Sequence, residues 1–168
     1  CEACHGPGLA HSENPSQFSV VGLRDPKTRM DVCASCHSRR SQVAEGFMPE
    51  SRLLDHYVPS LLDEGLYFAD GQILDEVFVY GSFVQSKMHY AGVTCGDCHA
   101  PHSARLLRED NDVCTACHSP GGSSRFPGLQ PKVYDSPEHH FHASSAAAGK
   151  VARVVGTGSA CVDCHMAA

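Results

Sequence analysis

The chain has 168 residues, about the length of one domain, and its 13 Lys and Arg against 19 Asp and Glu give a formal net charge of −6 at pH 7. An acidic balance argues against a nucleic-acid partner, because surfaces that bind nucleic acids are basic. The longest apolar stretches, such as residues 77–80, are far shorter than a membrane-spanning helix requires. No transmembrane segment is therefore predicted.

Five Cys-x-x-Cys-His motifs use all ten cysteines of the chain. The pattern is typical of covalent haem attachment, in which two thiols bond to the haem vinyl groups and the next histidine ligates the iron. The sequence therefore predicts five haem c groups. The attaching cysteines are Cys1, Cys4, Cys33, Cys36, Cys95, Cys98, Cys114, Cys117, Cys161 and Cys164, and the proximal iron ligands are His5, His37, His99, His118 and His165.

Zinc and disulfides explain the same cysteines less well. A tetrahedral structural zinc site normally takes two Cys-x-x-Cys pairs, so five pairs leave one without a partner. Ten cysteines in a secreted chain also fit a disulfide framework. Neither alternative requires a histidine directly after every second cysteine, whereas haem attachment does.

Five haems in a chain of this length leave no room for a separate apolar protein core. Tryptophan is absent, and only 7 Phe and 5 Tyr are present, so porphyrin is expected to supply most of the buried aromatic area. The predicted fold class is mostly coil with short α-helices and little or no sheet, a multihaem cytochrome c with the haems as its core. We expect residues 1–168 to form a single pentahaem domain whose folding depends on the cofactors.

The expected elements follow the motifs along the chain. One- or two-turn helices are predicted at each motif. A longer helix is favoured over residues 72–90, after a turn at Asp70-Gly71, with a short strand over residues 77–79 as the alternative. Asn111 or Asp112 is expected to cap a short helix that carries the fourth motif. Residues 119–124 predict a surface loop, and residues 143–149 a second loose segment.

Each iron needs a ligand on its other face, and seven histidines lie outside the motifs. His102 follows His99 by three residues, which places both on one side of a helical turn. We therefore expect His102 to ligate a different haem from the one ligated by His99. His11, six residues after His5, is expected to make the same kind of link from the Gly6–Gly8 turn. His89 lies at the end of the predicted long helix.

The run His139-His140-Phe141-His142 supplies three more candidates. In an extended backbone, His140 and His142 point one way and His139 the other, so the run is able to ligate two haems. It is the predicted source of the distal ligand for the Cys1–Cys4 haem, within the chain or from another molecule. His56 is the weakest candidate. The chain has four methionines, Met30, Met48, Met88 and Met166. They are expected to be packing residues. A methionine that ligated iron in place of histidine would raise the reduction potential of that haem.

Several segments together resemble a known family, the multihaem c-type cytochromes often fused to tetratricopeptide repeats, within the wider group of multihaem nitrite reductases and hydroxylamine oxidoreductases. In that group, histidines in positions like His11, His89 and His102 are typically distal ligands. Family members usually continue with further motifs on both sides. The segments that carry the resemblance are Cys1–Gly8 with His11, Cys36–Arg40, Asp70–Ile73, Tyr80–His89, Gly92–Cys95, Cys98–Ser103, His139–His142 and Cys164–Met166.

These patterns predict electron transfer through five mostly bis-histidine haems rather than an enzyme. The alternative is a reductase of a small nitrogen or sulfur oxyanion at one five-coordinate haem. Against the alternative, the chain has no Cys-x-x-Cys-Lys motif and no Arg/Tyr/His grouping that reads as an active site.

Haem c is attached outside the cytoplasmic membrane in prokaryotes, so we expect a periplasmic or extracellular protein, processed or excised from a longer precursor. Expected partners are other redox proteins or copies of the chain itself. Haem motifs lie at residues 1–5 and 161–165, so head-to-tail stacking would give a conducting filament. A periplasmic shuttle and a fragment of a longer cytochrome remain the alternatives.

Overall fold

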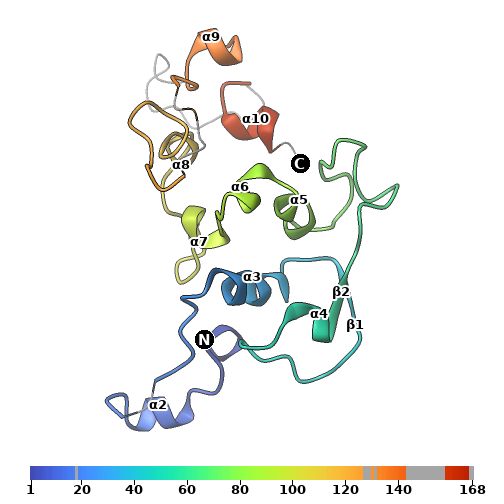
Figure 1. The fold of residues 1–168 in the computed structure, drawn as a ribbon, viewed down its shortest axis with the longest axis vertical. Helices are drawn as coiled ribbons and strands as arrows, with labels where there is room; N and C mark the ends of the chain where they lie inside the picture. Colours follow the sequence, from blue (N-terminus) through green and yellow to red (C-terminus); the bar gives the residue numbers. More distant parts are fainter. Residues whose placement is uncertain (18, 127–129, 131, 143–157, 167–168) are drawn as a thin grey trace. The chain divides into compact units, whose positions relative to one another are not determined.

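The computed structural model describes residues 1–17, 19–126, 130, 132–142 and 158–166. Most of this chain is coil, interrupted by short helices and two small sheets (Figure 1), which confirms the predicted fold class. The helices are α1 (Glu2–His5), α2 (Leu9–Glu13), α3 (Pro26–Ala34), α4 (Leu53–His56), α5 (Tyr80–Val84), α6 (Lys87–Tyr90), α7 (Cys95–Cys98), α8 (Asp112–Thr115), α9 (Pro137–His140) and α10 (Cys161–His165). The strands are β1 (Arg40–Gln42), β2 (Tyr57–Pro59), β3 (His99–Ala100) and β4 (Arg105–Leu106).

The chain divides into two compact units, Cys1–Cys95 and Gly96–Ala168, and the division falls inside the third motif. In both units the two-stranded sheets are antiparallel, with β1 paired to β2 and β3 to β4. The prediction of a single domain stays a prediction.

Helix α3 organises the first unit, and its start is set by the sequence. Asp25 lies at the N-cap and its carboxylate accepts a hydrogen bond from the Thr28 amide at 2.7 Å. Pro26 follows at the first helical position, where its missing N–H has no intrahelical partner to lose. The helix ends at Ala34, so it carries Cys33 of the second motif and positions the rest of that motif in the following turn.

A small apolar core forms against α3. Met30, Val32 and Ala34 on the helix are buried, together with Leu53 of α4 and Val77. The pair β1–β2 is tied to the helix by Arg40, whose Nε donates to the Ser35 carbonyl at 2.6 Å and whose guanidinium lies 3.6 Å from the centre of the Tyr57 ring. More large apolar side chains are exposed than buried among the described residues.

The predicted helix over residues 72–90 is wrong for its first part and interrupted in its second. The Val77 carbonyl accepts a hydrogen bond from the Arg39 amide at 3.1 Å instead of from a residue further along a helix. Phe78 then takes a left-handed conformation at φ 59°, which a continuous helix excludes. Helix α5 begins only at Tyr80, and Ser86 caps a new helix, α6, by accepting a hydrogen bond from the His89 amide at 3.2 Å.

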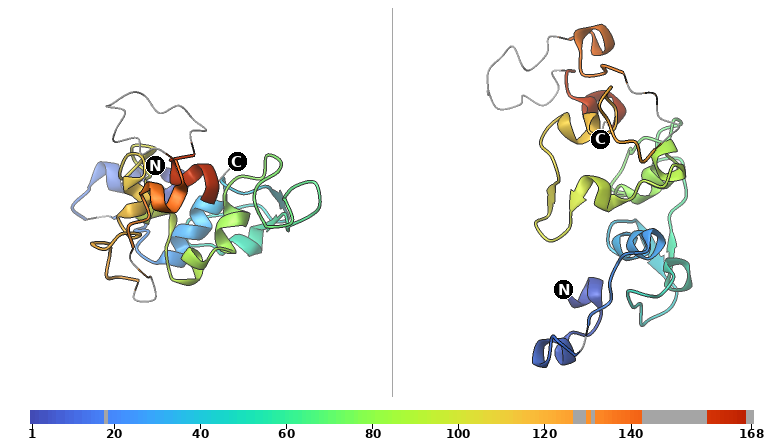
Figure 2. Two further views of the ribbon diagram at one scale, coloured as in Figure 1. Left: turned by 90° about the horizontal axis from the view of Figure 1, so that it is seen from above. Right: turned by 60° about the vertical axis from the view of Figure 1, so that its left-hand side comes forward.

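In the second unit, α8, α9 and α10 lie close together in all three ribbon views (Figures 1 and 2). The buried residues here are few and mainly polar: Asn111, Ser159 and Ala160. The expected loop at residues 119–124 is present as a series of turns. The predicted loose segment at residues 143–149 lies outside the described residues.

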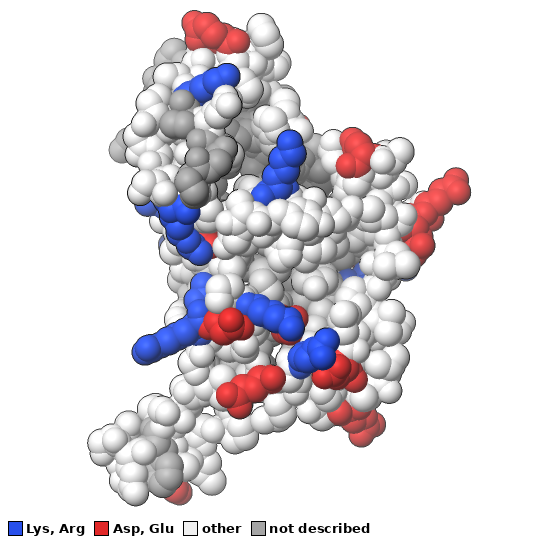
Figure 3. Space-filling model, viewed as in Figure 1, with Lys and Arg blue, Asp and Glu red and all other residues white. Residues whose placement is uncertain are grey.

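No helix among the described residues has both the length and the apolar character needed to cross a membrane. On the face drawn in Figure 3, the Lys and Arg side chains are interspersed with Asp and Glu.

Candidate haem sites

Every motif lies in or at the end of a helical turn, as predicted. The five helices concerned are α1, α3, α7, α8 and α10. In a helix, residues three apart lie on one side. Both cysteines of a motif lie within α7 and within α10, whereas α3 and α8 end before the second cysteine. None of the ten cysteines, all of which lie in the described part of the chain, is in a disulfide bond, so their sulfurs are available for thioether bonds.

The first motif shows how a proximal histidine is oriented. The Nδ1–H of His5 donates to the Val21 carbonyl at 2.7 Å, and the Val21 amide donates back to the His5 carbonyl at 3.1 Å. This bond fixes the tautomer and leaves the lone pair on Nε2, the atom that a metal-ligating histidine offers. Gly6, at φ 71°, turns the chain directly after the motif. The local geometry therefore fits a histidine held beneath a haem.

Neighbouring motifs bring their thiols together. The Cys33 thiol hydrogen-bonds with the Cys95 thiol, and this contact, with burial, raises the pKa of Cys33. Cys95 Sγ also lies 3.4 Å from the sulfur of Met30. In the second unit, burial is the main cause that raises the pKa of Cys98, with smaller contributions from Asp97 and Cys117. The third motif therefore has a thiol beside a thiol of the second motif and another near a thiol of the fourth.

A cavity of about 430 Å³ lies beside these thiols in the first unit. Its volume falls within the range of about 300–1,000 Å³ typical of sites for small molecules and cofactors. Apolar atoms make up most of the wall, and the lining includes Met30, Leu53, Val84, Val93 and the imidazole of His89. Three charged side chains also line it: Lys27, Asp31 and Arg52. Tyr80 also lines the cavity, and its burial raises the pKa of its phenol. The cavity thus has a largely apolar surface, one imidazole in its wall and a motif cysteine, Cys95, against its Met30.

The histidines of the 139–142 run are arranged differently from the extended backbone that the sequence predicted. His139 and His140 lie in α9, and Phe141 ends the helix in the left-handed conformation at φ 60°. The structure nevertheless separates the His139 ring from the other two rings. The centroid of the His139 ring lies 6.1 Å from that of the His165 ring, and the two ring planes are 4° from parallel. The centroid of the His140 ring lies 6.3 Å from that of the His142 ring.

The rings of His139 and His165 are stacked nearly parallel to one another. Their centroid separation is close to the roughly 6 Å that two imidazoles keep when they bind one metal from opposite sides by bonds of about 2 Å. Tyr134 packs edge-on against both His139 and His118, which lies in the fourth motif. The run that was predicted to serve the Cys1–Cys4 haem therefore has one member beside the fifth motif.

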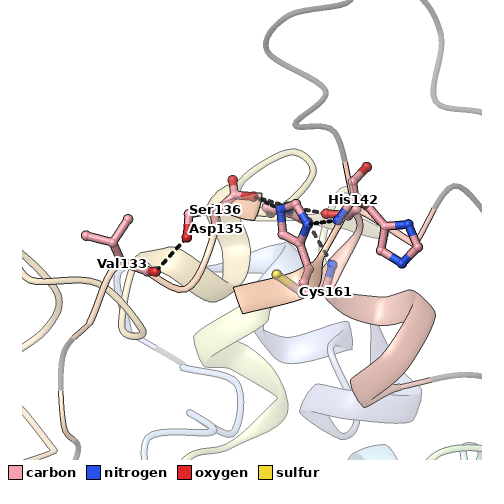
Figure 4. Close-up of polar contacts among 8 residues, drawn as sticks. Val133, Asp135, Ser136, His142 and Cys161 are labelled. Atoms are coloured by element: carbon pink, nitrogen blue, oxygen red, sulfur yellow. Dashed lines mark hydrogen bonds and ion pairs between the residues drawn. The ribbon is translucent and has the colours of Figure 1, made fainter. Parts of the chain in front are cut away.

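His140 is held in another way. Its side chain is 10% exposed, its Nδ1 accepts a hydrogen bond from the His142 amide at 3.2 Å, and its Nε2 lies 3.9 Å from the Asp135 carboxylate. Figure 4 shows Asp135, His142 and Cys161 in this cluster. Because Nδ1 accepts, the neutral ring carries its proton on Nε2. In this arrangement, the Nε2 atom of His140 carries a proton and has no lone pair with which to bind iron.

The structure corrects the geometry assumed for His102. Residues 99–106 form a β-hairpin rather than a helical turn, with β3 paired to β4 and His102 in the connecting turn. The spacing argument from a helix is therefore wrong, and ligation of a second haem by His102 stays a prediction. His11 lies half-buried in α2, and its predicted role is likewise untested.

Sequence reasoning ranked His56 as the weakest candidate, yet its ring is oriented as that of His5 is. Its Nδ1–H donates to the Glu45 carbonyl at 3.0 Å, and Phe47 packs edge-on against it with centroids 5.6 Å apart. The signal for this orientation lies in contacts across the chain reversal at residues 43–47, which the sequence pattern does not reveal. The described residues contain no group of three or more His, Cys, Asp or Glu placed to hold a bare metal ion.

A scan against models of protein families finds no match, and a search of curated proteins finds none either. Among solved structures, the chain is similar to the outer cell wall cytochrome OcwA, with a TM-score of 0.57 and 24% sequence identity. The match covers 73% of this chain and 38% of that one, so the chain spans well under half of the longer protein. At this level of identity the similarity concerns the fold, and the chain is folded like the matched part of an outer cell wall cytochrome.

Proposed function

We propose that the chain is a multihaem c-type cytochrome that transfers electrons through five covalently attached haems with mainly bis-histidine ligation. The observation that carries the proposal is the contact between attachment sites, above all the Cys33 thiol against the Cys95 thiol. Electron exchange between redox groups falls steeply with their separation. Attachment sites that touch hold their cofactors close enough for that exchange. The fold shared with an outer cell wall cytochrome supports the same function.

Haem supplies one-electron chemistry when it is bound, and the chain supplies attachment, ligation and shielding from water. The cysteine pairs on the helical turns hold the porphyrin edge. The proximal histidines bind iron from one side, and the Val21 carbonyl orients the first of them. For the fifth site we propose His139 as the ligand opposite His165, on the strength of their parallel rings. For a haem beside the apolar cavity we propose His89.

Export to the periplasm or cell exterior is part of the proposal, because covalent haem attachment takes place there. The partners proposed are other redox proteins. Head-to-tail assembly into a filament rests on the positions of the first and fifth motifs in the sequence alone. Negative-stain microscopy of the purified haem protein tests it: filaments at high concentration are expected, and discrete particles at every concentration would reject assembly.

Electron paramagnetic resonance of the oxidised protein tests the proposed function. Five low-spin ferric haems are expected, since two axial histidines complete the six-fold coordination of a haem iron. A high-spin signal from one haem in the unaltered protein would instead favour a reductase with an open coordination site.

A further inference from the structure

Asn111 is a buried polar residue whose side chain does not serve its own helix. It lies directly before α8, and its side chain makes no cap to that helix. Only 6% of the residue is exposed. The Nδ2 group donates to the Asp135 carboxylate at 2.8 Å and to the Ser159 carbonyl at 2.9 Å, and Oδ1 accepts from the Cys161 amide at 3.0 Å. These partners lie between 24 and 50 residues away in the sequence.

The main chain of Asn111 makes a second set of contacts, to the fourth motif. Its carbonyl accepts hydrogen bonds from the amides of Cys114 and Thr115, both at 2.9 Å. One residue thus binds the amide of the first cysteine in two motifs, Cys114 through its backbone and Cys161 through its side chain. Cys161 is the first residue of α10, where a helix leaves its amide without an intrahelical partner. The Asn111 side chain supplies that partner from the other motif.

The third contact extends the link to the segment before α9. Asp135 receives one hydrogen of the Asn111 amide, and Ser136, the next residue, is the N-cap of α9. That helix carries His139, whose ring faces His165 of the fifth motif. The carboxamide therefore joins the fourth attachment helix, the fifth attachment helix and the segment that leads to the proposed distal histidine. A buried polar group whose hydrogen bonds are all made fixes one arrangement of the elements that it joins.

Asparagine is suited to this position by its chemistry. The contacts use one oxygen acceptor and two amide hydrogens, which a single carboxamide offers and a carboxylate does not. Aspartate of the same shape would keep the acceptor for the Cys161 amide and lose both donors. It would also face Asp135 with a like charge. Leucine of similar volume would lose all three contacts without changing the charge.

We propose that Asn111 is the positioning residue that fixes the fourth and fifth haem sites relative to one another, and so sets the coupling between those two haems. The inference rests on the proposed function, because it concerns the haems attached at Cys114–Cys117 and Cys161–Cys164. Asn111 touches neither iron nor substrate. It acts through the cysteine amides and through the helix that carries His139.

The test uses the fully haem-loaded protein with Asn111→Leu and Asn111→Asp. Asn14→Leu and Asn14→Asp serve as matched controls, since Asn14 is exposed and its side chain makes local hydrogen bonds, to Gln17 and from Ser16. Paramagnetic NMR of the oxidised protein reports each haem separately through its methyl resonances. In both Asn111 variants, the methyl resonances of the fourth and fifth haems should shift while the other three sets stay in place. The Asn14 variants should leave all five sets unchanged.

A charge effect is separated from a positioning effect by the double variant Asn111→Asp/Asp135→Asn, which keeps the net charge of the native pair. The new amide at position 135 is able to donate to the new carboxylate, so the shifts should be partly reversed relative to Asn111→Asp. Partial reduction, followed by exchange NMR, should show slower electron exchange between the fourth and fifth haems in Asn111→Leu than in the native protein.

Unshifted fourth and fifth resonances in the Asn111 variants would overturn the inference, and so would equal shifts at all five haems. If Asn111→Leu attaches haem incompletely, Asn111→Asp and the double variant decide between these outcomes. A native protein that itself carries fewer than five haems would instead contradict the proposed function.

Discussion

The rings of His139 and His165 lie 6.1 Å apart, centre to centre, with planes 4° from parallel. One belongs to α9 and the other to the fifth motif in α10, and 25 residues separate them in the sequence. The proposal that both rings ligate the fifth haem starts from this centroid separation. The relationship leads directly to a test of how the fifth haem obtains its sixth ligand.

Replacing His139 with alanine should convert one haem from low spin to high spin, because His165 then remains as its one protein ligand. Electron paramagnetic resonance of the oxidised protein measures the change. His142→Ala is the control, since the ring of His142 lies beside His140 rather than beside a proximal histidine. Unchanged low-spin signals in His139→Ala, or a high-spin signal in the control alone, would move the distal role away from His139.

Removing the side chain of Leu53 should destabilise the first unit. Leu53 is 1% exposed and lines the cavity beside α3, so alanine there leaves a void that costs about 2–5 kcal/mol of unfolding free energy. Leu61→Ala is the control, because Leu61 is 76% exposed. Chemical denaturation of the haem-loaded proteins gives both values. Equal losses in the two variants would show that the cavity wall is not part of the folded core.

Gly158 makes a close approach to His142 that a larger residue would block. It adopts φ +74°, and a Cβ placed there would overlap the His142 ring. Gly46, at φ +78°, has open space around the same position and is a matched control. Alanine at Gly46 should cost roughly 1–2 kcal/mol from the left-handed backbone alone. Alanine at Gly158 should cost more and shift the His142 resonances. Equal costs with unmoved His142 signals would refute the contact.

The start of α3 should respond to acid through Asp25. Hydrogen bonds from the Thr28 amide and hydroxyl, in that order, hold the pKa of this carboxyl below its usual value of 3.8. A lowered folded-state pKa means that the stabilisation is present above pH 3.8 and is lost as the pH falls through the lower value. Protection of the Thr28 amide from hydrogen exchange should therefore fall in strong acid. Asp25→Asn, which caps without titrating, should abolish the acid step; the same step in both proteins would contradict this assignment.

The sequence predicted the short helices around the attachment motifs, because each motif is local. Asp25-Pro26 is also a local signal, and α3 begins there. The long helix over residues 72–90 failed for a nonlocal reason. Its apolar spacing is compatible with a helix, but the Val77 carbonyl is taken by Arg39, 38 residues earlier in the chain.

Contacts between distant segments also decided where the candidate iron ligands lie and which residues connect the haem sites, and the sequence pattern does not reveal such contacts. The spacing of His99 and His102 fits a helix and a hairpin turn equally, and the pairing of β3 with β4 selects the hairpin. Asn111 or Asp112 was expected to cap α8, as asparagine and aspartate commonly do. The Asn111 side chain instead reaches Asp135, Ser159 and Cys161, contacts that depend on how distant segments meet.

Intact-mass spectrometry of the purified protein tests the central claim most directly. The account predicts five covalently bound haems and no free thiol, because the five motifs use all ten cysteines. Acid acetone should extract no haem. A free thiol, an extractable haem or a mass that corresponds to fewer than five haems would contradict the account.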